Sequence, residues 1–166
     1  VVNDSSDVGQ LHAMAKAAKD VLEAETLQAL ADEGYYSSTE LKACEDDDIK
    51  AYVPVPEGNG RLEKVGRFSL KNFSHDPAAE AYRCPAGELL RPMEGRWTNA
   101  SGRVEIRYAS RKATCDACQL RARCLSPKAR YRTIGRWEHE DVLERHRARM
   151  QGARELMRRR STSHHR

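Results

Sequence analysis

An acidic residue, Asp32, directly follows a short apolar run near the start of the chain. The run at residues 27–31 contains Leu, Gln and Ala without a charge, a composition that predicts a buried strand. Gly34 and Ser37, which come next, indicate a turn into a helix. A carboxylate at the carboxyl end of a strand lies where open α/β folds place their chemistry. A turn acid or helix N-cap is the structural alternative for Asp32.

Four of the five cysteines lie in one stretch of the sequence and could bind a metal. Cys115 and Cys118 have the C-x₂-C spacing that lets two thiolates share one ion. Together with Cys84 and Cys124 they supply four soft ligands, a set that suits tetrahedral Zn²⁺. Reduced thiols in a small core are the alternative, and disulfides are disfavoured in an intracellular protein. Cys44 falls on the apolar side of a predicted helix, where we expect plain packing.

The carboxyl-terminal third of the chain is strongly basic. Residues 111–166 carry 16 Lys and Arg against 6 Asp and Glu, a balance of +10, whereas residues 1–110 carry 13 against 19, a balance of −6. A basic surface of this kind suits DNA phosphates, and a solvated arginine-rich helix is the alternative. The residues predicted to contact DNA are Arg145, Arg149, Arg158, Arg159 and Arg160.

The elements that would position these residues alternate between helix and strand. Apolar residues recur at helical spacing over residues 8–22, and a strand is predicted at residues 26–31. Ser37 and Glu40 have the spacing of a capping box that starts a second helix, and residues 51–55 indicate a second strand. This order predicts an α/β unit.

After this unit the pattern changes. Strand-like pieces at residues 81–83 and 104–108 indicate a β-rich module, and helical spacing returns after residue 133. The expected division is a partial α/β core at 1–56, a linker at 57–71, an inserted cysteine-containing module at 72–132 and a long basic helix at 133–166.

The length and composition bound the class of protein. At 166 residues, with 33% charged and 6% aromatic residues, the chain suits one domain or a small domain with an inserted module. No apolar run approaches the ~20 residues that span a bilayer, and no secretory signal is evident. We therefore expect an intracellular, cytoplasmic protein without a membrane partner.

Four motifs, in this order along the chain, point to one family. They are ADEGYYS at residues 31–37, CPAGELL at 84–90, CDACQLRARC at 115–124 and RTIGRWEHEDVLERHRARM at 132–150. Together they resemble the insertion-sequence transposases of the DDE class, whose catalytic core is RNase H-like. The resemblance covers nearly the whole chain and implies a bacterial protein associated with the nucleoid.

The resemblance implies metal-dependent DNA cleavage and strand transfer at insertion-sequence ends. The family holds two Mg²⁺ or Mn²⁺ ions with two Asp and one Glu, and Asp32 matches the second Asp. The first Asp is expected upstream of Val1, and Ser163 and His164 stand where the family has Val and Glu. We therefore expect a transposase fragment, incomplete at both ends and inactive alone, from a parent enzyme that could form a homo-oligomer.

The remaining motif residues leave alternatives open. The cysteine segments match positions of the family's insertion, which supports a structural zinc site there. Glu138, His139 and Glu140 belong to the family-like RWEHE string, and a structural pairing with nearby Arg is favoured over a place near the active site. The second functional reading is a zinc-stabilised basic module that binds DNA without cutting it, and the third is a chain that neither folds stably nor functions.

Overall fold

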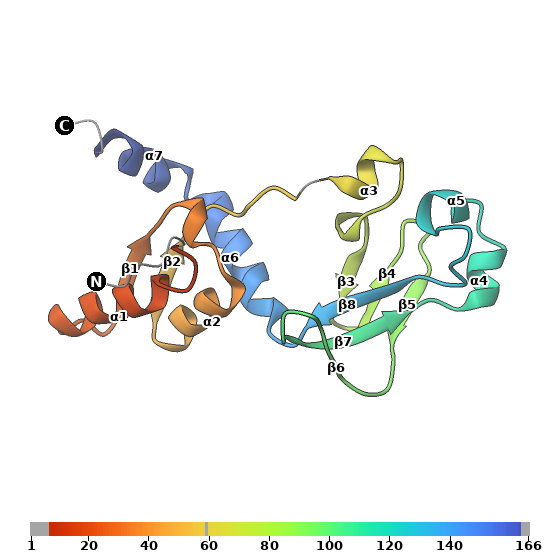
Figure 1. The fold of residues 1–166 in the computed structure, drawn as a ribbon, viewed down its shortest axis with the longest axis horizontal. Helices are drawn as coiled ribbons and strands as arrows, with labels where there is room; N and C mark the ends of the chain where they lie inside the picture. The colour runs from red at the N-terminus through yellow and green to blue at the C-terminus, as the bar shows by residue number, and fades with distance from the viewer. Residues whose placement is uncertain (1–6, 59, 164–166) are drawn as a thin grey trace. The chain divides into compact units, whose positions relative to one another are not determined.

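The computed structural model describes residues 7–58 and 60–163, drawn in Figure 1. They divide into two compact units. Unit 1 combines Val1–Glu57 with His139–Arg166, and unit 2 is the intervening Gly58–Glu138. The chain is a mixed α/β protein with a mostly antiparallel sheet. Within the described part, no helix is both long and apolar enough to cross a membrane.

Unit 1 contains a small parallel sheet covered by helices. Its elements are α1 (Leu11–Val21), β1 (Leu27–Leu30), the short 3₁₀ helix η1 (Glu33–Tyr35), α2 (Ser38–Asp46), β2 (Ile49–Tyr52), α6 (Glu140–Gly152) and α7 (Arg154–Ser163). β1 and β2 pair in parallel, with Leu27 opposite Ile49, and α2 makes the crossover between them. The predicted order of helix, strand, helix and strand is therefore confirmed.

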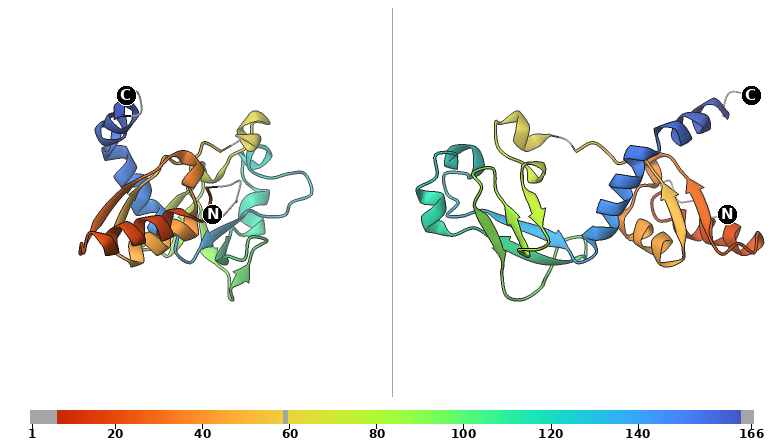
Figure 2. Two further views of the ribbon diagram at one scale, coloured as in Figure 1. Left: turned by 60° about the vertical axis from the view of Figure 1, so that its left-hand side comes forward. Right: turned by 180° about the vertical axis from the view of Figure 1, so that it is seen from behind.

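The core of unit 1 lies between α2, the strands and α6. Its buried residues include Leu41, Cys44, Ile49, Ala51, Val53, Val142 and Leu143. Burial raises the pKa of the Cys44 thiol to about 11, which agrees with its predicted packing role. α1 adds Leu11 and Ala15 from one face, and Figure 2 shows it beside α2.

Polar contacts fix α1 to α2. The backbone N–H of His12 donates to the carboxylate of Glu40 at 2.7 Å, and the His12 ring lies 2.5 Å from Asp47. This hydrogen bond from His12 lowers the pKa of the Asp47 carboxyl. Ser37 caps α2 as predicted, accepting from the backbone N–H of Glu40 at 3.5 Å. By accepting from the His12 N–H, the Glu40 carboxylate pairs a backbone donor in the first turn of α1 that has no partner within that helix.

Unit 2 is built on a six-stranded antiparallel sheet. Its elements are α3 (Arg61–Lys64), η2 (Leu70–Asn72), β3 (Ser74–Asp76), β4 (Ala81–Arg83), β5 (Leu89–Pro92), β6 (Trp97–Thr98), β7 (Val104–Ala109), α4 (Lys112–Asp116), α5 (Arg121–Cys124) and β8 (Thr133–Trp137). β8 pairs with β7 along one edge, so the short β5 and β6 share the opposite edge of β7.

The core of unit 2 lies on one face of this sheet and is rich in aromatic residues. It contains Phe68, Phe73, Tyr82, Leu90, Tyr108 and Ile134, with Cys84 and Cys124 packed against it. Tyr82 and Tyr108 meet edge to face with ring centroids 5.0 Å apart. The strands predicted at residues 81–83 and 104–108 are confirmed.

Two expected segments differ from the structure. Residues 58–71, expected as part of a linker, belong to unit 2, because Phe68 enters its core and the Phe68 N–H donates to the Arg123 carbonyl at 2.8 Å. Residues 133–137, expected to begin the basic helix, form β8, since the exposed edge of β7 supplies backbone partners. The helical region that follows is two helices, α6 and α7, which meet at Ala153.

A crossed pair of core substitutions tests the division into units. Leu90 is fully buried in unit 2 and Leu41 is 2% exposed in unit 1. Truncation to Ala at either position should cost about 2–5 kcal/mol of unfolding free energy in its own unit. Both tryptophans, Trp97 and Trp137, lie in unit 2, so their fluorescence reports that unit, while helical circular dichroism mainly reports unit 1. A single common transition, shifted equally by Leu90→Ala and Leu41→Ala, would contradict the division.

Candidate functional site

Asp32 lies at the carboxyl end of β1, as the sequence predicts. The Ala31 N–H makes the last bond to β2, donating to the Tyr52 carbonyl at 3.0 Å, and Asp32 is the next residue. The Asp32 carbonyl accepts from the Tyr35 N–H at 3.0 Å, which starts η1, but its exposed carboxylate makes no capping bond there. The geometry therefore places a solvent-accessible acid at the end of a parallel strand.

A groove runs beside β1 and reaches Asp32. Leu27 and Ala31 turn their backbone N–H groups toward β2, so the alternating residues Gln28 and Leu30 turn theirs toward the opposite edge. Among the described residues, β1 pairs only with β2. The groove between α1 and β1 has a volume of about 460 Å³ and ends at Asp32 and Tyr35.

The surroundings of Asp32 do not by themselves form a magnesium or manganese site. Two-metal chemistry needs several oxygen ligands around ions about 4 Å apart. In the part of the chain that the structure describes, no three His, Cys, Asp or Glu side chains are grouped to hold an ion. Asp32 can supply one ligand, and the remaining carboxylates would have to come from elsewhere.

The far edge of β2 is closed by α6. His146 is fully buried, and its Nε2 lies 2.8 Å from the carbonyl oxygen of Val53. The Arg149 Nε donates to the carbonyl of Ala51 at 3.1 Å, and its guanidinium lies 5.8 Å from the centre of the Tyr52 ring. Arg149, predicted to contact DNA, thus has a structural role at the sheet edge.

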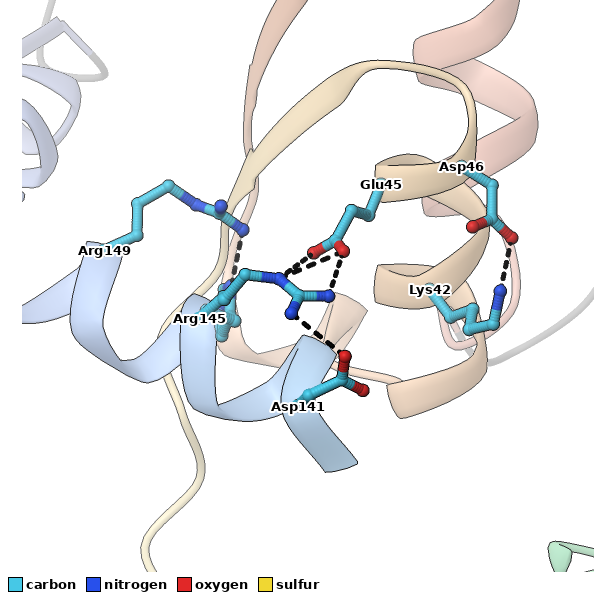
Figure 3. Close-up of polar contacts among 7 residues, drawn as sticks. Lys42, Glu45, Asp46, Asp141, Arg145 and Arg149 are labelled. Carbon is cyan, nitrogen blue, oxygen red and sulfur yellow. Dashed lines mark hydrogen bonds and ion pairs between the residues drawn. The ribbon is translucent and has the colours of Figure 1, made fainter. Parts of the chain in front are cut away.

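Arg145 also has protein partners. Figure 3 shows its guanidinium between Glu45 of α2 and Asp141 of its own helix. It donates to Asp141 at 3.0 Å and from Nε to Glu45 at 3.1 Å, and these bonds raise the pKa of Arg145. Exposed ion pairs of this kind add little to the unfolding free energy, so their main effect is to orient the Arg145 side chain.

The other arginines predicted to contact DNA lie on α7. Arg158 is exposed and pairs with Glu155 within that helix. Arg159 and Arg160 fall within the span of α7, but their side chains lie outside the described part of the structure. The phosphate-binding role of these three residues stays a prediction.

The four predicted zinc ligands belong to unit 2. Cys84 follows β4, Cys115 lies in α4, Cys118 follows that helix, and Cys124 ends α5. All four line one cavity of about 30 Å³. All are free thiols, and burial raises the pKa of Cys124 while the charge of Arg132 opposes that shift. The four cysteines therefore line the same cavity, and their role as zinc ligands stays a prediction.

Two residues that the structure shows to be important were not singled out from the sequence. His146 lies four residues after Val142 and three after Leu143, so helical periodicity could have placed it on the buried face. Arg121 also lines the cysteine cavity, and no local pattern distinguishes it from the other arginines nearby.

Comparison of the chain with protein-family models, with curated proteins and with solved structures finds no match. The functional argument therefore depends on the geometry of the residues and on the motif resemblance.

Substituting Arg145 and Arg149 of α6 should separate a structural contact from a surface pair. Arg149→Met removes the donor to the Ala51 carbonyl and should lower the unfolding free energy of unit 1 by about 1.5–3 kcal/mol, the range for bonds to charged groups. Arg145→Met should cost less than about 1 kcal/mol. Urea unfolding followed by helical circular dichroism measures both, and an equal or larger loss for Arg145→Met would refute the assignment.

His146 should make unit 1 sensitive to mild acid. Burial lowers the pKa of His146 in the folded protein below the ordinary value of 6.5. Just below pH 6.5 this histidine is therefore protonated in the unfolded chain but still neutral in the folded protein. The unfolding free energy of unit 1 is therefore highest above pH 6.5 and falls as the pH drops, by up to about 1.4 kcal/mol per pH unit. Unfolding curves between pH 7 and about pH 5 measure the slope.

The control for this titration is His146→Gln, which keeps a side-chain N–H for the Val53 carbonyl but does not titrate. Its unfolding free energy should vary much less over the same pH range. An unchanged slope in the variant would assign the pH dependence to another group.

Proposed function

We propose that the chain is a DNA-binding part of a DDE-class transposase. In this proposal unit 2 contacts DNA phosphates, and Asp32 of unit 1 is one of the carboxylates that hold Mg²⁺ or Mn²⁺ in the complete enzyme. The chain alone is not expected to cut DNA. The motif resemblance supports the transposase assignment, and the distribution of charge supports DNA binding.

The observation that carries the proposal is the separation of charge between the units. Unit 2 has 17 Lys and Arg against 8 Asp and Glu, a balance of +9, whereas unit 1 has 12 against 17, a balance of −5. The basic excess thus belongs to unit 2 more than to the carboxyl-terminal helices. A strongly basic module gains affinity for DNA by releasing counterions from the phosphates.

Part of this charge is held rigidly by aromatic rings. On the sheet face opposite the aromatic core, Trp97 and Trp137 lie on either side of Glu105, across β6, β7 and β8. The guanidinium of Arg107 lies 5.1 Å from the centre of the Trp97 ring, and that of Arg103 lies 4.4 Å from Trp137. A stacked guanidinium loses little freedom when it binds an anion, and both arginines contribute to the positive balance of unit 2.

The second candidate function is DNA binding without catalysis. It is favoured by the absence of a three-ligand metal group among the described residues. Both candidates share the basic unit 2, and they differ only over whether Asp32 binds a metal ion.

DNA binding is tested with exposed cations that make no ion pair described above. Arg91→Gln with Arg130→Gln, both in unit 2, should weaken binding of a labelled DNA duplex and reduce the salt slope by about 2, since each phosphate contact contributes about 0.9. Lys16→Gln with Lys50→Gln is the control in unit 1 and should change neither; both cations are exposed, and Lys16 pairs with Asp20 at 3.7 Å. Fluorescence anisotropy over a salt series measures both. Equal effects of the two pairs, or no complex at low salt, would refute the proposal.

The two candidates are separated by Mn²⁺ titration of the DNA complex. With Asp32 as a single ligand, Mn²⁺ should bind weakly, and paramagnetic relaxation detects even low occupancy. The amide resonances of residues 32–35 should therefore broaden in the wild type, and Asp32→Asn should abolish the broadening without changing DNA affinity. If the resonances are broadened equally in Asp32→Asn, or in neither protein, the binding module without catalysis is the correct reading.

A further inference from the structure

We propose that Cys84, Cys115, Cys118 and Cys124 bind one Zn²⁺ ion in the cavity of unit 2, and that Arg121 supplies a hydrogen bond to a coordinating sulfur. The site would be structural, because all four ligand positions are filled by protein. This inference concerns unit 2 alone and does not depend on the proposed role in transposition.

The backbone around the cysteines is already arranged in tight turns. The Cys84 N–H donates to the Glu88 carbonyl and the Gly87 N–H to the Cys84 carbonyl, both at 2.8 Å. Gly87 has a φ of 87°, a left-handed conformation that glycine adopts without strain. In the second turn the Leu120 N–H points to the Cys118 sulfur at 3.4 Å. Hydrogen bonds of this kind stabilise a thiolate when it binds a metal.

The cavity is large enough for one ion. Its volume of about 30 Å³ exceeds the about 10–15 Å³ that a cavity needs to hold one water molecule, so an ion can be accommodated. Within the described residues, the cysteine side chains are not grouped closely enough to hold an ion. Binding therefore requires the thiol groups to turn toward the cavity that they already line, until each sulfur is about 2.3 Å from the ion.

Arg121 provides an independent indication of an anionic occupant. Its Nη2 donates to the Ala129 carbonyl at 2.9 Å, but its Nη1 is buried without a hydrogen-bond partner. Buried donors of this kind are costly, and Arg121 lines the same cavity as the cysteines. A zinc ion with four thiolates has a net charge of −2, so a coordinating sulfur would satisfy Nη1.

Arg132 adds a second positive charge at the cavity. Its Nη1 donates to the Cys124 carbonyl at 3.0 Å, and its guanidinium lies 4.9 Å from the centre of the Phe73 ring. The two arginines together balance the charge of the tetrathiolate site. Zinc binding would release the thiol protons to the solvent, up to four for each ion.

The elements that carry the cysteines are too short to be stable alone. α4 has five residues and α5 has four, and neither has a side-chain N-cap bond. A metal that joins β4, α4 and α5 would cross-link this part of unit 2, as structural zinc does in other small modules with limited cores.

The test uses the full chain, stripped of metal under reducing conditions and titrated with Co²⁺ in the absence of DNA. Co²⁺ bound by four thiolates in a tetrahedron gives intense visible bands and sulfur-to-metal charge transfer. We expect saturation at one Co²⁺ per chain, displacement by Zn²⁺, and a higher unfolding temperature of unit 2 by tryptophan fluorescence. The absence of these bands, or a spectrum without thiolate ligands, would overturn the proposal even if every variant failed to fold.

Cysteine variants assign the ligands. Cys118→Ser should lose the tetrathiolate spectrum, whereas Cys44→Ala, which removes the remaining thiol from unit 1, should keep it unchanged. If Cys44→Ala also loses the spectrum, or if Cys118→Ser keeps it, the ligand assignment is wrong. Formation of two disulfides in place of metal binding would also overturn it.

Arg121→Met tests the proposed hydrogen bond from Arg121 to a coordinating sulfur. The variant should still bind one Co²⁺ per chain, but about 10–100-fold more weakly, the usual effect of removing a group that hydrogen-bonds a metal ligand. Arg130→Met, at a nearby exposed arginine, is the control and should bind as tightly as the wild type. Equal affinities for Arg121→Met and wild type would remove Arg121 from the site.

Discussion

The fold of unit 1 depends on how the two edges of its parallel sheet are satisfied. A parallel strand pair is seldom stable unless its faces and edges are covered. α6 covers one edge, where His146 and Arg149 pair with the carbonyls of Val53 and Ala51, more than 90 residues away in the sequence. The other edge borders a groove that ends at Asp32. The candidate catalytic residue therefore lies on the less protected side of the sheet.

The two units use arginine differently. In unit 1, Arg145 and Arg149 have carboxylate and carbonyl partners and hold α6 in place. In unit 2, several guanidinium groups lie over aromatic rings, among them Arg107 on Trp97 and Arg123 on Phe68. Stacking leaves hydrogen-bond donors available, whereas a buried carbonyl contact uses them. The basic character of a segment therefore does not by itself predict which of its arginines can bind an anion.

The sequence predicted the local features of the fold better than the long-range ones. The end of β1 shortly before Asp32, the Ser37 cap and the strand at Ala81–Arg83 follow from composition and spacing within a few residues. The strand at Thr133–Trp137 could not be predicted in this way, because its partner β7 lies about 30 residues earlier and the edge of β7 decides its conformation. The C-x₂-C spacing indicated the cysteine cluster, but Arg121 enters that cavity only through the fold.

The order in which the chain is made has a consequence for unit 1. Its segments Val1–Glu57 and His139–Arg166 are separated by the whole of unit 2. During synthesis β2 emerges long before the helix that satisfies its outer carbonyls, while unit 2 can fold as soon as β8 has emerged. An exposed strand edge in a nascent chain is a site for mispairing. Unit 1 thus passes through a vulnerable interval on the ribosome, which rapid folding of unit 2 cannot shorten.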